Sequence, residues 1–240
     1  MPNIHLRPTD LSGAIAGNEL SLHYLPQVKV TEGRLDGVEC FLRWPHPALG
    51  MVGPADIAEI VREGAMHAEL DRWVVGTATR QLRDWRSAGV EIPRVCVSVW
   101  RESLGDRGFV ESVIAAAAGG SLEIKCPRGA LAEPGLRALA DGGVRIATDV
   151  MADEDPGELR IATLKIPPGV VRELDGNEDV VRRTVAVAAT HGMRVVAEGV
   201  ETVAQQDALV ALGCVVVQGY LYGPEAPAEE ITKLVVAGGA

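Results

Sequence analysis

The sequence predicts an α/β fold, a (β/α)8 barrel formed by one domain of 240 residues. Three observations predict it. From Val95 onward, short β-branched runs alternate with helix-compatible stretches, which is typical of a parallel sheet. A predicted hairpin precedes them, and its two strands bring the expected total to the eight of a closed barrel. No Pro/Gly/Ser-rich linker divides the chain, so we expect one domain over residues 1–240, with its core over about residues 11–236.

The N-terminal part of the chain predicts a short helix, a β-hairpin and two longer helices. The short helix, Leu11–Leu20, follows Thr9 and Asp10, which are favoured N-cap residues. The hairpin turns at Glu32-Gly33. Its strands are expected at Leu20–Val30 and Leu35–Trp44, and the two helices at Pro54–Glu63 and Glu69–Ala88.

The rest of the chain predicts alternating strands and helices. The strands are expected at Val95–Val99, Leu122–Ile124, Val144–Thr148, Leu164–Ile166, Val195–Ala197 and Val215–Val217. The helices are expected at Asp106–Ala118, Pro134–Asp141, Glu178–His191, Val203–Leu212 and Pro227–Val236. The segment Met151–Arg160 is polar and weakly patterned. An open Rossmann-type sheet is the alternative, but no Gly-rich phosphate loop follows the first strand.

The composition favours a soluble cytoplasmic protein. Its formal net charge of -10 opposes binding to nucleic acid polymers, whose phosphates must be neutralised by Lys and Arg. No apolar span reaches about 18 residues, so no membrane segment is expected. The cysteines form no C-x-x-C pair and have apolar neighbours, which indicates buried thiols in a reducing compartment.

Polar side chains stand near the ends of the predicted strands from the second to the eighth. In strand order they are Glu39 and Arg43, Ser98, Glu123 and Lys125, Asp149, Lys165, Glu198, and Gln218. Because the active sites of (β/α)8 barrels lie at the C-terminal ends of the strands, we expect the four carboxylates to converge on one mouth. Crowded carboxylates need a cation, and all-oxygen ligation suits Mg²⁺ or Mn²⁺. Taken singly, each residue is equally well explained as a solvated strand end or a helix cap.

Several spaced motifs resemble the EAL domain, the phosphodiesterase domain for the bacterial messenger cyclic di-GMP. The segment Glu39-Cys40-Phe41-Leu42-Arg43-Trp44-Pro45-His46-Pro47 resembles the signature E-A-L-L-R-W-x-H-P. Leu164-Lys165-Ile166 resembles L-K-I-D, and residues 197–202 match A-E-G-V-E-T. Gly213-Cys214 and Gln218-Gly219-Tyr220 then follow in the family's order. The resemblance runs from about Leu11 to the C-terminus and implies a modified TIM barrel with one antiparallel strand.

The resemblance also implies roles for the matched residues. In active members, two Mg²⁺ or Mn²⁺ ions activate a water that opens cyclic di-GMP to linear pGpG. Metal ligation is implied for Glu39, Glu123 and Asp149, residual catalytic roles for Lys165 and Glu198, and ligand binding for Arg43, Glu201 and Gln218. The metal site is incomplete, because Ser98 and Val150 stand where the family has an Asn and a second Asp. Further departures are Leu25 for a Gln that helps hold the dinucleotide, Lys125 and Cys126 in the E-L-T-E motif, and Pro167 for an Asp.

These departures predict a degenerate, catalytically inactive EAL domain in cyclic di-GMP signalling. Val150 cannot ligate a metal, and one well-placed electrostatic group is often worth about 10² to 10³ in rate. Three hypotheses stay open. In the first, the mouth binds cyclic di-GMP without cleaving it and signals to a protein partner, with no cofactor required. In the second, the domain is a ligand-independent protein-binding scaffold. In the third, it is a weak phosphodiesterase that uses one metal and gives pGpG. A homodimer is a further open alternative.

Overall fold

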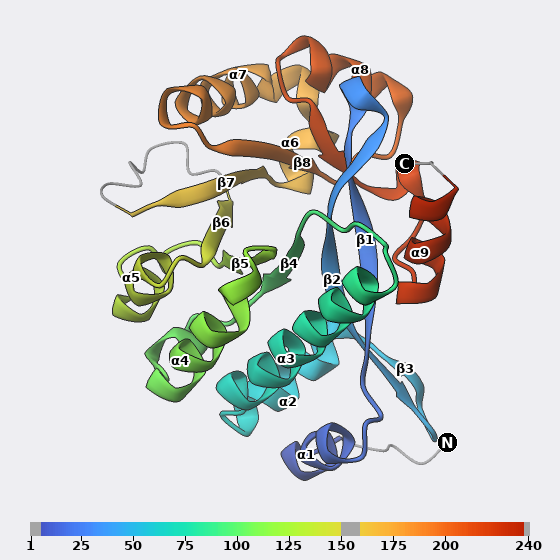
Figure 1. Cartoon of the computed structure of the whole chain (residues 1–240), viewed down its shortest axis with the longest axis vertical. Helices are drawn as coiled ribbons and strands as arrows, with labels where there is room; N and C mark the ends of the chain where they lie inside the picture. The colour runs from blue at the N-terminus through green and yellow to red at the C-terminus, as the bar shows by residue number, and fades with distance from the viewer. Residues whose placement is uncertain (1–5, 150–158, 238–240) are drawn as a thin grey trace.

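The computed structural model describes residues 6–149 and 159–237, and in these ranges nine strands form one sheet. All of them except β3 form a barrel in the order β1-β9-β8-β7-β6-β5-β4-β2, which closes where β1 pairs with β2 (Figure 1). The bounds of the strands are β1 (Ser21–Lys29), β2 (Arg34–His46), β3 (Gly50–Val52), β4 (Val95–Ser98), β5 (Leu122–Cys126), β6 (Arg145–Asp149), β7 (Ile161–Ile166), β8 (Arg194–Glu198) and β9 (Val216–Gln218).

One strand of the barrel runs against the others. β1 is antiparallel to both β2 and β9, whereas β2 and β4 to β9 pair in parallel around the ring. The modified barrel with one antiparallel strand is thereby confirmed. The hairpin of β1 and β2 turns at Gly33, whose φ of 58° is a left-handed conformation that glycine adopts without strain. The short strand β3 was not predicted, because three residues are too few to show an alternation.

The helices lie outside the ring of strands (Figure 1). Their bounds are α1 (Pro8–Ala16), α2 (Pro54–Glu63), α3 (His67–Ser87), α4 (Arg107–Ala116), α5 (Pro134–Asp141), α6 (Pro168–Arg172), α7 (Leu174–His191), α8 (Val203–Ala211) and α9 (Ala228–Val236). The predicted bounds of α2 and α5 are confirmed, and both helices begin with a proline in the first turn. The prediction for α1 was wrong at both ends: Asp10 lies inside the first turn and accepts a hydrogen bond from the Arg7 amide at 2.8 Å.

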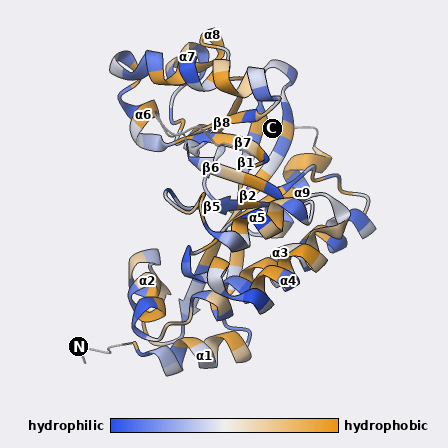
Figure 2. Ribbon diagram, turned by 90° about the vertical axis from the view of Figure 1, so that its left-hand side faces the viewer, coloured by the Kyte–Doolittle hydropathy of each residue, from blue (hydrophilic) through white to orange (hydrophobic). Residues whose placement is uncertain are grey.

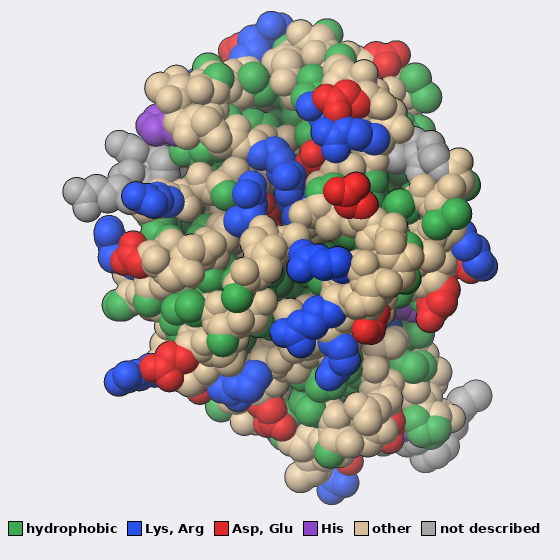
Figure 3. Space-filling model, viewed as in Figure 1, with side chains coloured by type: hydrophobic (Ala, Val, Ile, Leu, Met, Phe, Trp, Pro, Cys, Tyr) green, Lys and Arg blue, Asp and Glu red, His purple; other side chains and the backbone are tan. Residues whose placement is uncertain are grey.

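The long helix α3 packs an apolar face against the barrel. Leu70, Val74, Ala78 and Trp85 recur at helical spacing and are buried. Figure 2 shows hydrophobic and hydrophilic residues side by side along this helix. The Trp85 indole Nε1 donates to Thr232 Oγ1 of α9 at 2.9 Å, which ties the last helix to α3. On the outer surface, side chains of both charge signs are interspersed over the face seen in Figure 3.

Two glycines let the loops after β8 and β9 meet at the mouth of the barrel. Gly199 has a φ of 75°, in the left-handed region that favours glycine. A methyl group on Gly219 would lie only 2.2 Å from the Val200 carbonyl oxygen. The Val200 amide donates to the Gln218 carbonyl at 3.0 Å. This close approach fixes where the strand-end residues Glu198 and Gln218 point.

A buried acid on α3 holds the segment after β4. Asp71 is 2% exposed, and its Oδ2 accepts a hydrogen bond from the Trp100 amide at 2.8 Å. Within the described residues no Lys or Arg forms an ion pair with it. Burial raises the pKa of Asp71 to about 7, and the nearby Glu102 adds to this shift. The folded protein therefore binds a proton at Asp71 more tightly than the unfolded chain does.

We expect Asp71 to make the protein less stable as the pH rises toward 7. A carboxyl whose pKa is raised on folding contributes fully to the unfolding free energy at a pH below its pKa in the unfolded chain. That contribution is lost as the pH rises through the pKa in the folded protein, at up to about 1.4 kcal/mol per pH unit. Urea unfolding of the wild type and Asp71→Asn between about pH 4 and pH 8 should show that the unfolding free energy of the wild type declines more steeply. Parallel pH profiles would contradict this assignment.

Candidate functional site

The barrel mouth is built around a fully buried lysine. Lys165, on β7, is 0% exposed, and its Nζ donates to Glu39 Oε2 and to Glu198 Oε1, each at 2.9 Å. Gln218 on β9 donates from Nε2 to the same Glu39 oxygen at 2.7 Å. Ser98 Oγ, at the end of β4, donates to the other Glu39 oxygen at 3.3 Å. Residues from five strands, β2, β4, β7, β8 and β9, thus meet at one point.

A second lysine extends this cluster toward solvent. Lys125 Nζ lies 3.0 Å from Glu198 Oε2 and 3.2 Å from Glu198 Oε1. The same nitrogen lies 3.1 Å from Asp149 Oδ1. We call Glu39, Lys125, Asp149, Lys165 and Glu198 the mouth cluster. Each of its three carboxylates contacts a lysine, and its formal charge is three negative plus two positive, or -1.

The lysines set the ionisation of this cluster. Burial opposes the charge on Glu39, but Lys165 and Lys125 outweigh it and lower the pKa of Glu39 to about 2. Burial likewise opposes the charge on Lys165, yet Glu39 and Glu198 raise its pKa well above the ordinary value. Burial raises the pKa of Glu198, with Lys165 opposing that shift. Glu39 and both lysines are therefore charged at neutral pH.

The expected convergence of four carboxylates is wrong for Glu123. Its side chain is 0% exposed and lies deeper in the barrel, where Oε2 accepts from Thr163 Oγ1 at 2.6 Å and Oε1 lies 3.2 Å from Arg194 Nη2. The physical reason is position along the strand: Glu123 is the second residue of β5, whereas Lys125 lies two residues further on and pairs with Ser98 at the end of β4. Because residues two apart on a strand face the same side, both point inward, and Lys125 is the one that reaches the mouth. A metal-ligating role for Glu123 stays an untested prediction.

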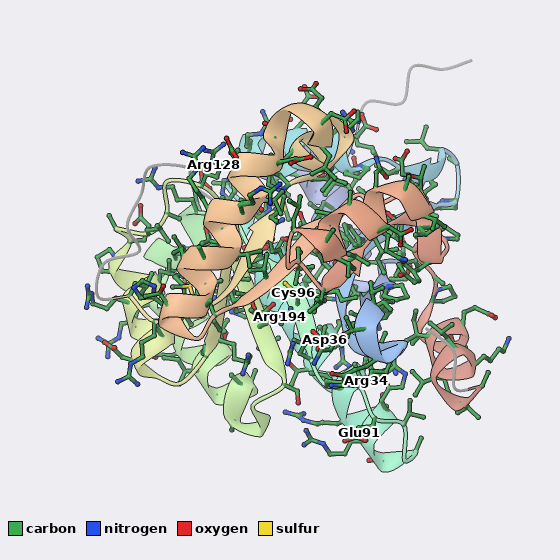
Figure 4. The ribbon with its side chains drawn as sticks, turned by 90° about the horizontal axis from the view of Figure 1, so that it is seen from above. Arg34, Asp36, Glu91, Cys96, Arg128 and Arg194 are labelled. Atoms are coloured by element: carbon green, nitrogen blue, oxygen red, sulfur yellow. The ribbon has the colours of Figure 1, made fainter. Side chains whose placement is uncertain are left out.

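Around Glu123 lies a second buried network, which the sequence did not reveal. Arg194, at the start of β8, donates to Asp36 from Nη1 and to Gln27 Oε1 from Nη2 at 2.9 Å. Arg94 Nη1 donates to the same Asp36 oxygen at 2.8 Å. Figure 4 shows Asp36 and Arg194 close together. We call Gln27, Asp36, Arg94, Glu123 and Arg194 the lower network.

One glutamine joins the two networks through the barrel interior. Gln27 is 0% exposed; its Oε1 accepts from Arg194, and its Nε2 donates to Gln218 Oε1 at 2.8 Å. Gln218 in turn donates to Glu39. The barrel is therefore filled by a continuous set of hydrogen-bonded polar side chains. Polar residues that alternate along a predicted strand are the sequence signal that could have located this interior network.

A pocket of about 320 Å³ opens over the mouth cluster. Its polar lining comes from Glu39, Ser98, Lys125, Glu198, Glu201, Gln218, Tyr220 and Glu225. The predicted ligand residue Arg43 is held at its edge, because Arg43 Nη2 lies 3.2 Å from Glu225 Oε1 and Nη1 donates to the Leu42 carbonyl at 2.8 Å. Glu201 is exposed, while the following Thr202 caps α8 by accepting from the Gln205 amide at 3.2 Å. Val150 lies outside the described residues.

This fold and mouth define a modified TIM-barrel domain with an acidic, lysine-containing site at the C-terminal ends of its strands. The chain belongs to the EAL domain family, whose model matches residues 9–225.

Among its relatives is the bifunctional diguanylate cyclase/cyclic di-GMP phosphodiesterase MucR of Pseudomonas aeruginosa, 32% identical over 245 residues that cover 94% of this chain and 36% of MucR. The cyclic di-GMP phosphodiesterase PA2567 of the same organism is 31% identical over 234 residues, covering 89% of this chain and 40% of that protein. The chain thus spans well under half the length of these curated relatives.

Solved structures show the same fold. The structure described as the PaMucR phosphodiesterase in complex with c-di-GMP has a TM-score of 0.83 and 30% identity, and the match covers 93% of this chain and 98% of that one. The FimX EAL domain of Xanthomonas citri has a TM-score of 0.80 with 23% identity, covering 90% and 92% of the two chains, and shows likeness of fold alone. Among the described residues, no helix has both the length and the apolar character to cross a membrane.

EAL phosphodiesterases typically use Mg²⁺ or Mn²⁺, and the mouth cluster does not fit such an ion. The carboxylates of Glu39, Asp149 and Glu198 are each in contact with a lysine ammonium. In the part of the chain that the structure describes, no three His, Cys, Asp or Glu side chains are arranged to hold a metal. The predicted Mg²⁺ or Mn²⁺ would have to displace a lysine to reach these oxygens.

Proposed function

We propose that this EAL domain acts in cyclic di-GMP signalling without hydrolysing the nucleotide, as a module that binds cyclic di-GMP at the barrel mouth. The observation that carries the proposal is the position of the Lys125 ammonium, 3.0 Å from Glu198 and 3.1 Å from Asp149. A cationic side chain thus occupies the space between two carboxylates of the kind that ligate a metal or position a water.

Hydrolysis is disfavoured by more than one feature of the mouth. Lys165, the residue implied to assist catalysis, has two of its donor directions committed to Glu39 and Glu198. Both Glu198 oxygens already accept hydrogen bonds from lysine ammonium groups, so a water would have to compete with Lys125 or Lys165 for them. Since one electrostatic group is often worth about 10² to 10³ in rate, loss of the metal and of a free base together supports a silent site.

Nucleotide binding is supported by the retained pocket. Its volume of about 320 Å³ falls within the range typical of small-molecule sites and suits part of a dinucleotide. The exposed Glu201 presents acceptors of the kind that guanine edges pair with, and Arg43 can exchange Glu225 for a phosphate. The predicted ligand residue Gln218 instead has its amide engaged by Glu39 and Gln27. The MucR structure, 30% identical, is described as a complex with c-di-GMP.

A second candidate is a protein-binding scaffold that takes no nucleotide. It is favoured by the charge around the mouth: five carboxylates, from Glu39, Asp149, Glu198, Glu201 and Glu225, face three cations, from Arg43, Lys125 and Lys165. The balance of five negative and three positive charges is -2, which opposes a dianionic ligand. Recognition of a protein partner would then fall to the outer surface of the barrel.

We expect calorimetric titration with cyclic di-GMP to give the same binding heat in Mg²⁺ and in EDTA. Arg43→Ala should weaken binding, whereas Arg182→Ala, an exposed arginine paired with Glu178 on α7, should not. Incubation of the wild type with cyclic di-GMP and Mn²⁺ should leave the nucleotide intact. Formation of pGpG that disappears in Glu39→Ala would overturn the proposal in favour of a weak phosphodiesterase. An absence of heat in both buffers would favour the scaffold.

A further inference from the structure

The ammonium of Lys125 occupies the place where a bridging cation would bind. Its Nζ is within 3.2 Å of both Glu198 carboxylate oxygens and 3.1 Å from Asp149 Oδ1. A Mg²⁺ shared by these carboxylates would have to lie about 2.0 to 2.1 Å from an oxygen of each. The ion and the ammonium would then compete for the same oxygens at short distance.

The burial of this lysine makes the arrangement durable. Lys125 is only 16% exposed, and its stem comes from β5, in the barrel wall. Its ammonium is held between carboxylates from two other strands, Asp149 at the end of β6 and Glu198 at the end of β8.

The charges also match. Lys125 and Lys165 together supply two positive charges to the three carboxylates of the mouth cluster, as one divalent ion would. Unlike an ion, they are covalently part of the barrel and cannot be removed by a chelator. Carboxylates that already pair with ammonium groups attract a metal less strongly than free ones do.

We infer that Lys125 is a built-in counter-ion that closes the mouth to divalent metals, and that a carboxylate in its place completes a metal site with Asp149 and Glu198. This inference deepens the proposed non-hydrolytic function and rests on it. It assigns to Lys125 the exclusion of a metal, a role distinct from nucleotide binding.

The test measures Mn²⁺ binding in the absence of nucleotide. Binding is detected as a loss of the electron paramagnetic resonance signal of free Mn²⁺. We expect the wild type to leave the signal unchanged and Lys125→Glu to bind one Mn²⁺ per chain at least tenfold more tightly. Lys233→Glu makes the same charge change on α9, where the side chain is 71% exposed, and should behave as the wild type. Lys125→Gln is the second Lys125 variant and is titrated in the same way. Circular dichroism establishes that each variant is folded.

Two results would overturn the inference. In one, the wild type binds Mn²⁺ as tightly as Lys125→Glu does. In the other, the folded Lys125 variants bind no more Mn²⁺ than Lys233→Glu. Thermal unfolding of the wild type gives a check that needs no variant. A metal that binds the folded state raises the melting temperature, so Mn²⁺ should leave the melting temperature of the wild type unchanged. Failure of the proposed function shows separately, as pGpG formation or as absence of nucleotide heat.

Discussion

Lys165→Met is expected to lower the free energy of unfolding by about 3 to 5 kcal/mol, because removing one partner of a buried ionic group leaves its counter-charges unpaired. Lys165 is 0% exposed, and it contacts Glu39 and Glu198, which are 3% and 7% exposed. Without the ammonium, Glu39 keeps only the neutral donors Ser98 and Gln218 among its contacts described above, while Glu198 keeps Lys125. The measurement is urea unfolding at neutral pH. The slope of unfolding free energy against urea concentration is compared between the variant and the wild type, to confirm that both expose the same surface on unfolding.

A matched control and a rescue distinguish lost charge from lost packing. Lys233→Met changes an exposed lysine on α9 and should leave the unfolding curve unchanged. Adding Glu39→Gln to Lys165→Met should restore part of the lost stability, since one unpaired carboxylate becomes a neutral amide. Equal stability of Lys165→Met and the wild type would show that the mouth cluster does not support the fold. No recovery in the double variant would show that packing, and not charge, explains the loss.

The sequence predicted the barrel because its local signals agree with the fold. Helices α2 and α5 each begin with a proline, which defines a first turn, and their predicted bounds match the structure. The predicted strand Leu164–Ile166 is shorter than β7 because the polar Thr163 interrupts the apolar pattern that begins at Ile161. Helix α6 was missed because its five residues are too few to show a 3.6-residue period.

The site could be predicted only in part, because the depth of a side chain in a barrel depends on strand register. The alternation along β5 places Glu123 and Lys125 on the same inward face but does not tell which one reaches the mouth. The stagger between β4 and β5 decides it by pairing Ser98 with Lys125. Glu39, Lys165, Glu198 and Gln218 do lie together at the mouth. Their contacts with Gln27 and Lys125 depend on pairings between strands distant in sequence.

The two buried networks also explain how a barrel can keep a polar interior. The lower network supplies Arg194 and Arg94 to Asp36 and Glu123, and the mouth cluster supplies two lysines to three carboxylates. Each acid of these two networks therefore has a cation from another strand beside it. An ionic interior of this kind contributes specificity to strand pairing, because a shift in register would separate every pair at once.

Arg194→Met is the second change with a large expected effect, again about 3 to 5 kcal/mol of unfolding free energy. The Arg194 side chain is 12% exposed and donates to Asp36, Gln27 and Glu123, which lie on three other strands. Without it, Glu123 keeps only Thr163 and an Arg145 nitrogen 3.9 Å away. Arg194→Lys should recover little, because an ammonium cannot reproduce the forked contacts of a guanidinium.

The control for this prediction is Arg182→Met, on the exposed face of α7, where the arginine is 57% exposed and pairs with Glu178 one turn away. It should change the urea midpoint little, since exposed pairs of this kind contribute weakly. Arg194→Met combined with Glu123→Gln should regain part of the lost stability, because the amide can still accept from Thr163 and carries no charge. If Arg194→Met and Arg182→Met unfolded at the same urea concentration, the lower network would not hold the strands together, and hydrophobic contacts alone would account for the closure of the barrel.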